Sequence, residues 1–189
     1  MIAVVDYGAG NLRSVSLALM RTGAAHMVTD DAEAIACADG VILPGVGAFG
    51  DAMCALENKR LVEPLRRAAA DKPFLGICLG MQMLFERSEE SPGVGGLALL
   101  EGIVRRLPEV GLKIPQMGWN KLERRGEHVY FVHSYMCVPE DAVDIADTVD
   151  YGVPVVAVVR RGNLVGMQFH PEKSGAPGEQ LLKEFVALC

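Results

Sequence analysis

The sequence lacks the features that define several common classes of protein. No apolar run approaches the ~20 residues needed to span a bilayer. The first residues, Met1 to Asp6, meet an acid without any preceding basic stretch, so we expect a buried strand there and not a signal peptide. There is no repeat, low-complexity tract or linker, and 189 residues suit one domain covering residues 1–189.

Cysteine pairs and excess positive charge are also missing. The five cysteines are odd in number and form no Cys-x-x-Cys motif, which argues against a disulfide framework or a zinc site and favours a reducing cytosol. Lys and Arg total 18 against 24 Asp and Glu, a formal net charge of −6 that disfavours nucleic acid or an anionic membrane as partner. With 50% hydrophobic and 22% charged residues, the composition is globular. We therefore expect a cytoplasmic protein without a metal.

What the first half contains is an alternation of short apolar runs with helical patterns. Strands are expected at 2–5, 25–29, 41–43 and 74–77, and helices at 11–23, 32–36, within 49–70 and at 81–86. This order predicts a parallel sheet covered on both faces. Functional residues in such sheets follow the carboxyl ends of the strands.

The second half, from Leu97 onward, is mostly strand-like. Strands are expected at 129–132, 143–146, 153–159 and 164–169, with a hairpin turn at 161–163 and a closing helix at 178–188. The predicted fold is α/β, a flavodoxin-like three-layer sandwich whose mixed, mostly parallel sheet carries an antiparallel extension.

Cys78 stands out among the cysteines. It lies in Gly76-Ile77-Cys78-Leu79-Gly80, between a predicted strand and a predicted helix. This is the pattern of a nucleophile elbow with sulfur in place of the serine oxygen, where a sharp turn leaves no room for side chains at the glycines. A helix N-terminus would also favour the reactive thiolate. The alternative is a buried core cysteine, and this pattern alone leaves both open.

The segment His170-Pro171-Glu172 favours the catalytic alternative. In extended chain, residues i and i+2 point the same way, roughly 6.6 Å apart. Pro171 biases His170 towards extended geometry. Glu172 would then orient the imidazole, and the imidazole would take the thiol proton, which is the logic of a catalytic triad. A lone histidine is more often structural, but the cysteine elbow reverses that preference.

Attack on a carbonyl also requires an oxyanion hole. The N–H of Leu79, directly after the nucleophile, is one expected donor. Val46 is the other, because the glycines that flank it in Pro44-Gly45-Val46-Gly47 allow its N–H to turn inward. The alternative is an ordinary turn between a strand and a helix.

The same loop matches the dinucleotide fingerprint Gly45-x-Gly47-x-x-Gly50. That fingerprint expects an acid at the end of the following strand to hold a ribose. Here the following strand ends in Cys78, so nucleotide binding is disfavoured.

These motifs resemble the class I, triad-type glutamine amidotransferases, and within them the glutaminase subunits of imidazole glycerol phosphate synthase. The resemblance spans nearly the whole chain. The elbow and His-Pro-Glu are shared across the class, whereas Met-Gly-Trp-Asn and Phe-Val-His-Ser-Tyr are more specific to these subunits. The matching segments are Asp6–Asn11, Pro44–Phe49, Gly76–Gln82, Met117–Asn120, Tyr130–Tyr135 and Gln168–Ser174.

The resemblance implies a reaction and a partner. Glutamine is hydrolysed to glutamate through a thioester on Cys78, with His170 and Glu172 completing the triad and no cofactor. The ammonia passes to a separate (β/α)₈-barrel cyclase subunit, which forms imidazole glycerol phosphate and an aminoimidazole carboxamide ribotide in histidine biosynthesis. No segment of this chain suits an eight-stranded barrel, so the complex would be a heterodimer.

The resemblance also assigns further residues. Those that look like the glutamine pocket are Gly47, Gln82, Glu90, Ser134 and Tyr135. Those that look like the cyclase-facing surface and tunnel gate are Asn11, Trp119, Tyr130 and Lys173. The non-functional alternatives are a solvated acidic face for Glu90 and a core aromatic for Trp119. A tryptophan between Gly and Asn in a loop suits an interface at least as well as a core.

One departure and two other functions complete the prediction. Gln116 stands where this family usually carries His, which affects local detail of the interface or gate but not catalysis. The chain would otherwise be a glutaminase serving another synthase, such as pyridoxal phosphate synthase, or a catalytically silent binding subunit. A cysteine peptidase is less favoured, because no feature selects a peptide main chain.

Overall fold

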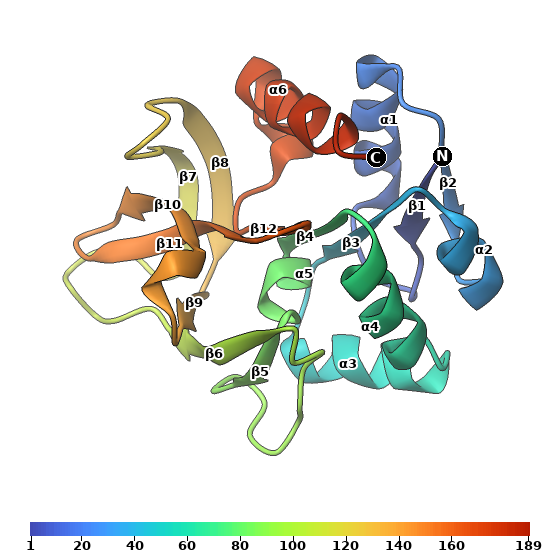
Figure 1. Cartoon of the computed structure of the whole chain (residues 1–189). Coiled ribbons are helices and arrows are strands. Elements are labelled where there is room, and N and C mark those ends of the chain that lie inside the picture. The colour runs from blue at the N-terminus through green and yellow to red at the C-terminus, as the bar shows by residue number, and fades with distance from the viewer.

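The computed structural model describes residues 1–189 and has a seven-stranded sheet at its centre, in the order β10-β11-β12-β4-β3-β1-β2 (Figure 1). The four strands of the first half are parallel to one another, as expected. They are β1 (Ile2–Val5), β2 (His26–Thr29), β3 (Gly40–Gly45) and β4 (Phe74–Cys78). The helices between them are α1 (Leu12–Thr22), α2 (Ala32–Cys37), α3 (Phe49–Asn58) and α4 (Val62–Asp71).

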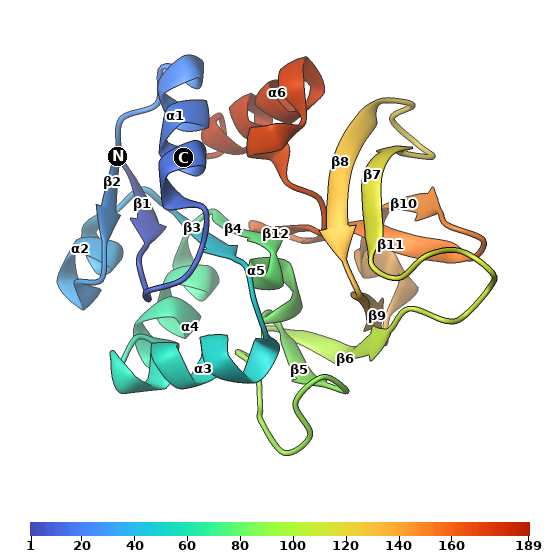
Figure 2. The ribbon, with the colours of Figure 1, turned by 180° about the vertical axis from the view of Figure 1, so that it is seen from behind.

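Helices cover both faces of this sheet. Alternate side chains of β1 point to opposite faces, so Ile2 and Val4 pack with α1 and the C-terminal helix α6 (Gly175–Val186), whereas Ala3 and Val5 pack with α2, α3 and α4. The two opposed layers of helices are visible in Figures 1 and 2. The predicted three-layer sandwich is therefore confirmed. No helix combines the length and the apolar character needed to cross a membrane.

The second half adds an antiparallel extension to the sheet. β12 (Leu164–Met167) pairs with β4 in parallel, and β11 (Pro154–Arg161) and β10 (Ile145–Asp150) follow it in antiparallel pairing. Two smaller sheets lie beside this extension (Figure 2). One joins β5 (Phe85–Ser88), β6 (Leu100–Arg106) and β9 (Tyr135–Pro139), and the other is the β7 (Gln116–Lys121) and β8 (His128–His133) pair.

Several predicted boundaries are wrong. The helix expected at 81–86 ends at Gln82 in α5 (Leu79–Gln82), because Phe85 already pairs with β6. The strand expected at 143–146 begins only at Ile145, after a 3₁₀ turn over Ala142–Asp144. The strand expected at 164–169 ends at Met167, and the final helix starts at Gly175 rather than at 178. The end of α5 and the start of β10 are decided by pairing with β6 and β11 rather than by the local pattern.

Candidate active site

Cys78 occupies the predicted elbow between β4 and α5. Its backbone has φ 56° and ψ −109°, a strained conformation for a residue with a side chain. A Cβ on Gly76 would lie 2.6 Å from the Gly80 carbonyl oxygen, and one on Gly80 would overlap the Leu43 carbonyl oxygen. The glycines are therefore required by close backbone approach. The helix that follows is a single turn, so its dipole favours the thiolate less than a long helix would.

His170 and Glu172 form the predicted pair, but on a different backbone. His170 is extended (φ −97°, ψ 97°), whereas Pro171–Lys173 is a 3₁₀ turn rather than a continuing strand. The turn still brings Nδ1 of His170 to 2.8 Å from Oε1 of Glu172, with both side chains at most 2% exposed. Because a carboxylate only accepts, Nδ1 carries the proton and Nε2 is the atom that can accept the thiol proton.

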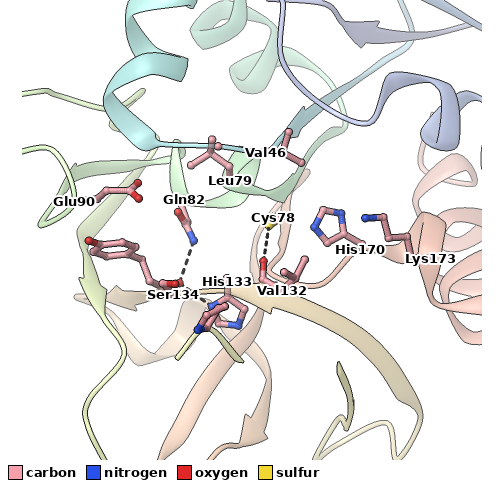
Figure 3. A pocket seen from close by; sticks show the side chains of 13 residues that line it. Val46, Cys78, Leu79, Gln82, Glu90, Val132, His133, Ser134, His170 and Lys173 are labelled. Atoms are coloured by element: carbon pink, nitrogen blue, oxygen red, sulfur yellow. Dashed lines mark hydrogen bonds between the residues drawn. The ribbon is translucent and has the colours of Figure 1, made fainter. Parts of the chain in front are cut away.

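The charge state of His170 depends on its two neighbours. Burial lowers its pKa, but hydrogen bonding and charge from Cys78 and Glu172 outweigh burial and raise the pKa to about 9. His170 is thus held as an imidazolium once Cys78 has given up its proton. In the resting arrangement the Cys78 thiol donates to the Val132 carbonyl at 3.9 Å (Figure 3).

A cavity of about 320 Å³ opens beside Cys78. It brings together Cys78, His170 and every residue predicted for the oxyanion hole and the glutamine pocket. In Figure 3, Gln82 and Glu90 lie on one side of Cys78 and His170 and Lys173 on the other. The predicted residues that line the cavity are Val46, Gly47, Cys78, Leu79, Gln82, Glu90, Ser134, Tyr135, His170 and Lys173.

The loop and the elbow that carry Val46 and Leu79 are packed tightly against each other. A Cβ on Gly45 would lie 2.7 Å from the Gly80 N, so the end of β3 can approach the elbow only as glycine. Val46 follows directly and is 41% exposed at the cavity, and Gly47 after it has φ 97°. Both segments thus end at the cavity beside Cys78, where Val46 and Leu79 are lining residues.

Glu90 is not a member of a purely solvated acidic face. Its Oε2 accepts from the Phe49 N–H at 2.7 Å, at the first turn of α3, while the residue also lines the cavity. Ser91 Oγ likewise accepts from the Gly50 N–H at 2.9 Å. The carboxylate is therefore held against a helix start, and its second oxygen remains for a cationic group in the cavity.

Trp119 and Tyr130 are cross-strand neighbours on the β7 and β8 pair. Their ring centroids are 6.0 Å apart at 68°, and the Lys173 ammonium lies 5.9 Å from the Tyr130 ring. Trp119 is thus in a strand, and not in a loop as predicted. It is 55% exposed and Met117 on the same face is 62% exposed, so the core-aromatic alternative is wrong.

Asn11 lies apart from the cavity, immediately before α1. Its side chain makes no capping hydrogen bond. Helix α1 packs against the 3₁₀ turn that carries Lys173, and this turn also packs against β8. Neither Asn11 nor Trp119 nor Tyr130 lines the cavity itself.

Gln116 is fully buried opposite His133 on β8. Its amide donates to Oδ1 of Asn120 at 3.1 Å. His133 donates from Nδ1 to the Tyr135 carbonyl at 2.8 Å, and burial lowers its pKa to about 4, so it is neutral. Gln116 is therefore not a lining residue itself, although Pro115 before it and His133 opposite it both line the cavity.

Sequence reasoning did not assign roles to three residues that the fold places at the site. Val132 and His133 line the cavity, and Gln168 directs its amide at the Cys78 sulfur from 3.8 Å. Gln168 stands two residues before His170, and this spacing could have suggested that Gln168 lies near the site. The contact itself depends on the register between β12 and β4 and cannot be read from spacing.

A cysteine elbow and a buried His–Glu pair at the carboxyl edge of a mostly parallel sheet define the class of triad-type amidotransferases. Residues 3–189 match the family described as "Glutamine amidotransferase class-I", and the chain belongs to this family.

Among curated relatives, the chain is similar to the protein named "Imidazole glycerol phosphate synthase subunit HisH" from Bacillus thuringiensis subsp. konkukian (strain 97-27). The two are 53% identical, with 98% of this chain and 93% of the relative covered. The protein of the same name from Bacillus anthracis is similar to the same extent.

Solved structures show the same fold at low identity. "Crystal structure of glutamine amidotransferase" has a TM-score of 0.80 at 19% identity, covering 99% of this chain and 100% of that one. "Structure of PurLQS from Thermotoga maritima" has a TM-score of 0.74 at 23% identity, covering 98% and 97%.

Proposed function

We propose that the chain, as one amidotransferase domain over residues 1–189, is the glutaminase subunit of an imidazole glycerol phosphate synthase in histidine biosynthesis. The observation that carries the proposal is the buried His170–Glu172 pair beside Cys78, in a chain 53% identical to relatives of that name. The free thiols of all five cysteines support a cytoplasmic location.

The proposed chemistry uses the His170–Glu172 contact and the position of Cys78 beside it. Nε2 of His170 takes the Cys78 proton, and the thiolate attacks the side-chain amide carbon of glutamine. The N–H groups of Leu79 and Val46 receive the oxyanion. The imidazolium then protonates the departing nitrogen, which leaves as ammonia and gives the thioester. Water, deprotonated by His170, releases glutamate and restores the thiol.

The cavity lining supports a glutamine substrate. The Glu90 oxygen that does not accept from Phe49 suits the α-ammonium group. The Gln82 amide donates to the Tyr135 carbonyl at 3.0 Å, so its oxygen is left to accept from the substrate. Gly47, Ser134 and Tyr135 complete the lining around the rest of the molecule.

The relatives are by name subunits of a synthase, so the chain works within a complex. We assign the partner as a (β/α)₈-barrel cyclase that receives the ammonia. The exposed Trp119 and the half-buried Tyr130, with the Lys173 ammonium over the Tyr130 ring, are the surface that would meet it, and Asn11 adds to this surface from the start of α1. Lys173 also lines the cavity, which suits a gate between the site and the partner.

Glutaminase assays with and without the cyclase subunit and its nucleotide ligand test the proposal. We expect weak activity alone and strong stimulation by the loaded cyclase. Cys78→Ala should lower glutamine-dependent synthesis at least about 1000-fold and leave ammonia-dependent synthesis by the cyclase intact. Cys54→Ala, at an exposed cysteine, is the matched control and should change neither. Glutamine turnover that survives in Cys78→Ala would contradict the assignment.

A further inference from the structure

A chain of buried carboxamides connects the wall of the cavity to the nucleophile. Gln168 is fully buried, and its Nε2 lies 3.8 Å from Sγ of Cys78. Its Oε1 lies 3.2 Å from Nε2 of Gln82, which also lies 3.0 Å from the Tyr135 carbonyl oxygen. Gln82 is 4% exposed and lines the cavity. The three side chains therefore form one continuous hydrogen-bonded row.

The fold brings Gln168 to Cys78 by strand register. β12 runs parallel to β4 with Met167 opposite Ile77, so the residues that follow this pair along the chain are Gln168 and Cys78. The Gln168 N–H donates to the Ala157 carbonyl at 2.9 Å, which holds its backbone to β11. Gln82 comes four residues after Cys78 and lies on the same side of the single-turn helix α5.

The Tyr135 carbonyl, at the end of the row away from Cys78, determines the direction of each hydrogen bond in the row. A carbonyl only accepts, so Gln82 must present its NH₂ group to Tyr135. The same NH₂ group faces Gln168, which must therefore present its oxygen to Gln82. This leaves the Gln168 NH₂ group facing the sulfur, as a donor.

We infer that Gln168 is a positioning residue for Cys78, whose buried amide N–H holds the sulfur in place and stabilises it as a thiolate. The inference rests on the proposed function, because it concerns the step in which Cys78 gives its proton to His170. After that step the Val132 carbonyl, which accepts from the thiol, is a poor neighbour for negative sulfur. The Gln168 N–H, a donor on a neutral side chain, then makes a charge-assisted hydrogen bond to the Cys78 thiolate without having to move.

The rate at which iodoacetamide alkylates Cys78, followed by peptide mass spectrometry over a range of pH, measures this effect in the complex with the cyclase subunit. Gln168→Met keeps the volume and removes the donor. We expect it to raise the pH midpoint of alkylation by about one unit and to lower kcat for glutamine about tenfold with KM within about twofold. Gln168→Glu places a carboxylate beside the sulfur and should raise the midpoint further. Gln180→Met, on the exposed face of α6, should change neither quantity.

A merely structural glutamine would lower the thermal midpoint of unfolding without moving the pH midpoint of alkylation, and that result would overturn the inference. The unsubstituted chain provides a second measurement if Gln168→Met does not fold. The side-chain ¹⁵N resonance of Gln168 should shift with pH at the alkylation midpoint and stay constant in Cys78→Ala. A resonance that does not move in the unsubstituted chain would also overturn it.

Alkylation needs no glutamine. Loss of the proposed function would appear as absent glutamine turnover in the unsubstituted complex. The role of Gln168 is judged separately, by the alkylation midpoint.

Discussion

His170 and Glu172 meet across a 3₁₀ turn, with Nδ1 of the imidazole 2.8 Å from Oε1 of the carboxylate and both side chains almost fully buried. The contact determines which nitrogen carries a proton in the neutral ring. It also leaves Nε2 for the Cys78 proton and makes the pair the base of the proposed glutaminase.

The raised pKa of His170 predicts the alkaline limit of turnover. The imidazolium must protonate the departing nitrogen, and it is retained until the pH rises through about 9. We therefore expect kcat/KM for glutamine, measured in the complex as glutamate formed, to fall about tenfold per pH unit above pH 9. Glu172→Gln removes one of the charges that raise this pKa and should move the limit about one unit lower. A rate that stays flat to pH 10 would contradict the role of His170.

The buried, neutral imidazole of His133 predicts that the folded chain loses stability in acid. Burial lowers its pKa to about 4 in the folded chain, whereas the unfolded chain takes up this proton near pH 6.5. The stabilising effect is complete above pH 6.5 and is lost as the pH falls to 4, which corresponds to about 3 kcal/mol.

Urea unfolding at pH 7 and pH 4.5 measures this loss for His133. His133→Gln should remove most of the pH-dependent component, and His128→Gln, at an exposed position on the same strand, should retain it. An unchanged pH dependence in His133→Gln would count against a buried neutral imidazole.

The close packing around Gly80 predicts that the elbow tolerates no larger side chain at this position. A Cβ on Gly80 would overlap the Leu43 carbonyl oxygen, with backbone on both sides and no flexible side chain to give way. Gly80→Ala should cost at least about 3 kcal/mol in the free energy of unfolding or displace Cys78. Gly95→Ala is the matched control, because its Cβ would meet nothing closer than the Glu86 carbonyl oxygen at 3.9 Å. Equal stability of the two variants, measured by thermal unfolding, would show that the elbow relaxes freely.

The exposure of Trp119 predicts that this residue contributes to binding of the cyclase subunit. The residue is 55% exposed and its ring meets that of Tyr130 edge to face, and tryptophan is among the residue types that most often anchor an interface. Trp119→Ala should weaken binding to the cyclase at least about tenfold by calorimetry, while the isolated chain unfolds at nearly the same temperature. Val143→Ala, at a 78% exposed apolar side chain outside this surface, should bind normally. Undiminished binding by Trp119→Ala would place the interface elsewhere.

The alternating strands and helices of the first half were predictable because they depend on local periodicity and on punctuation by glycine. Ile2–Val5 was predicted to the residue. The second half was less predictable, since β6 pairs with β9 across the intervening β7 and β8 hairpin, and Trp119 was assigned to a loop although it lies in β7. Strand pairing is decided by neighbours that a local pattern does not contain.

The sequence by itself indicated the chemistry of the site, because in this chain the elbow lies close to its glycines and the proposed base close to its acid. Gly76, Cys78 and Gly80 are close in sequence, as are His170 and Glu172. Only the tertiary structure decided what surrounds them. The parallel register of β12 with β4 brings Gln168 to Cys78, and the fold brings Glu90 to the first turn of α3. Contacts between distant segments depend on register and packing, which no local spacing encodes.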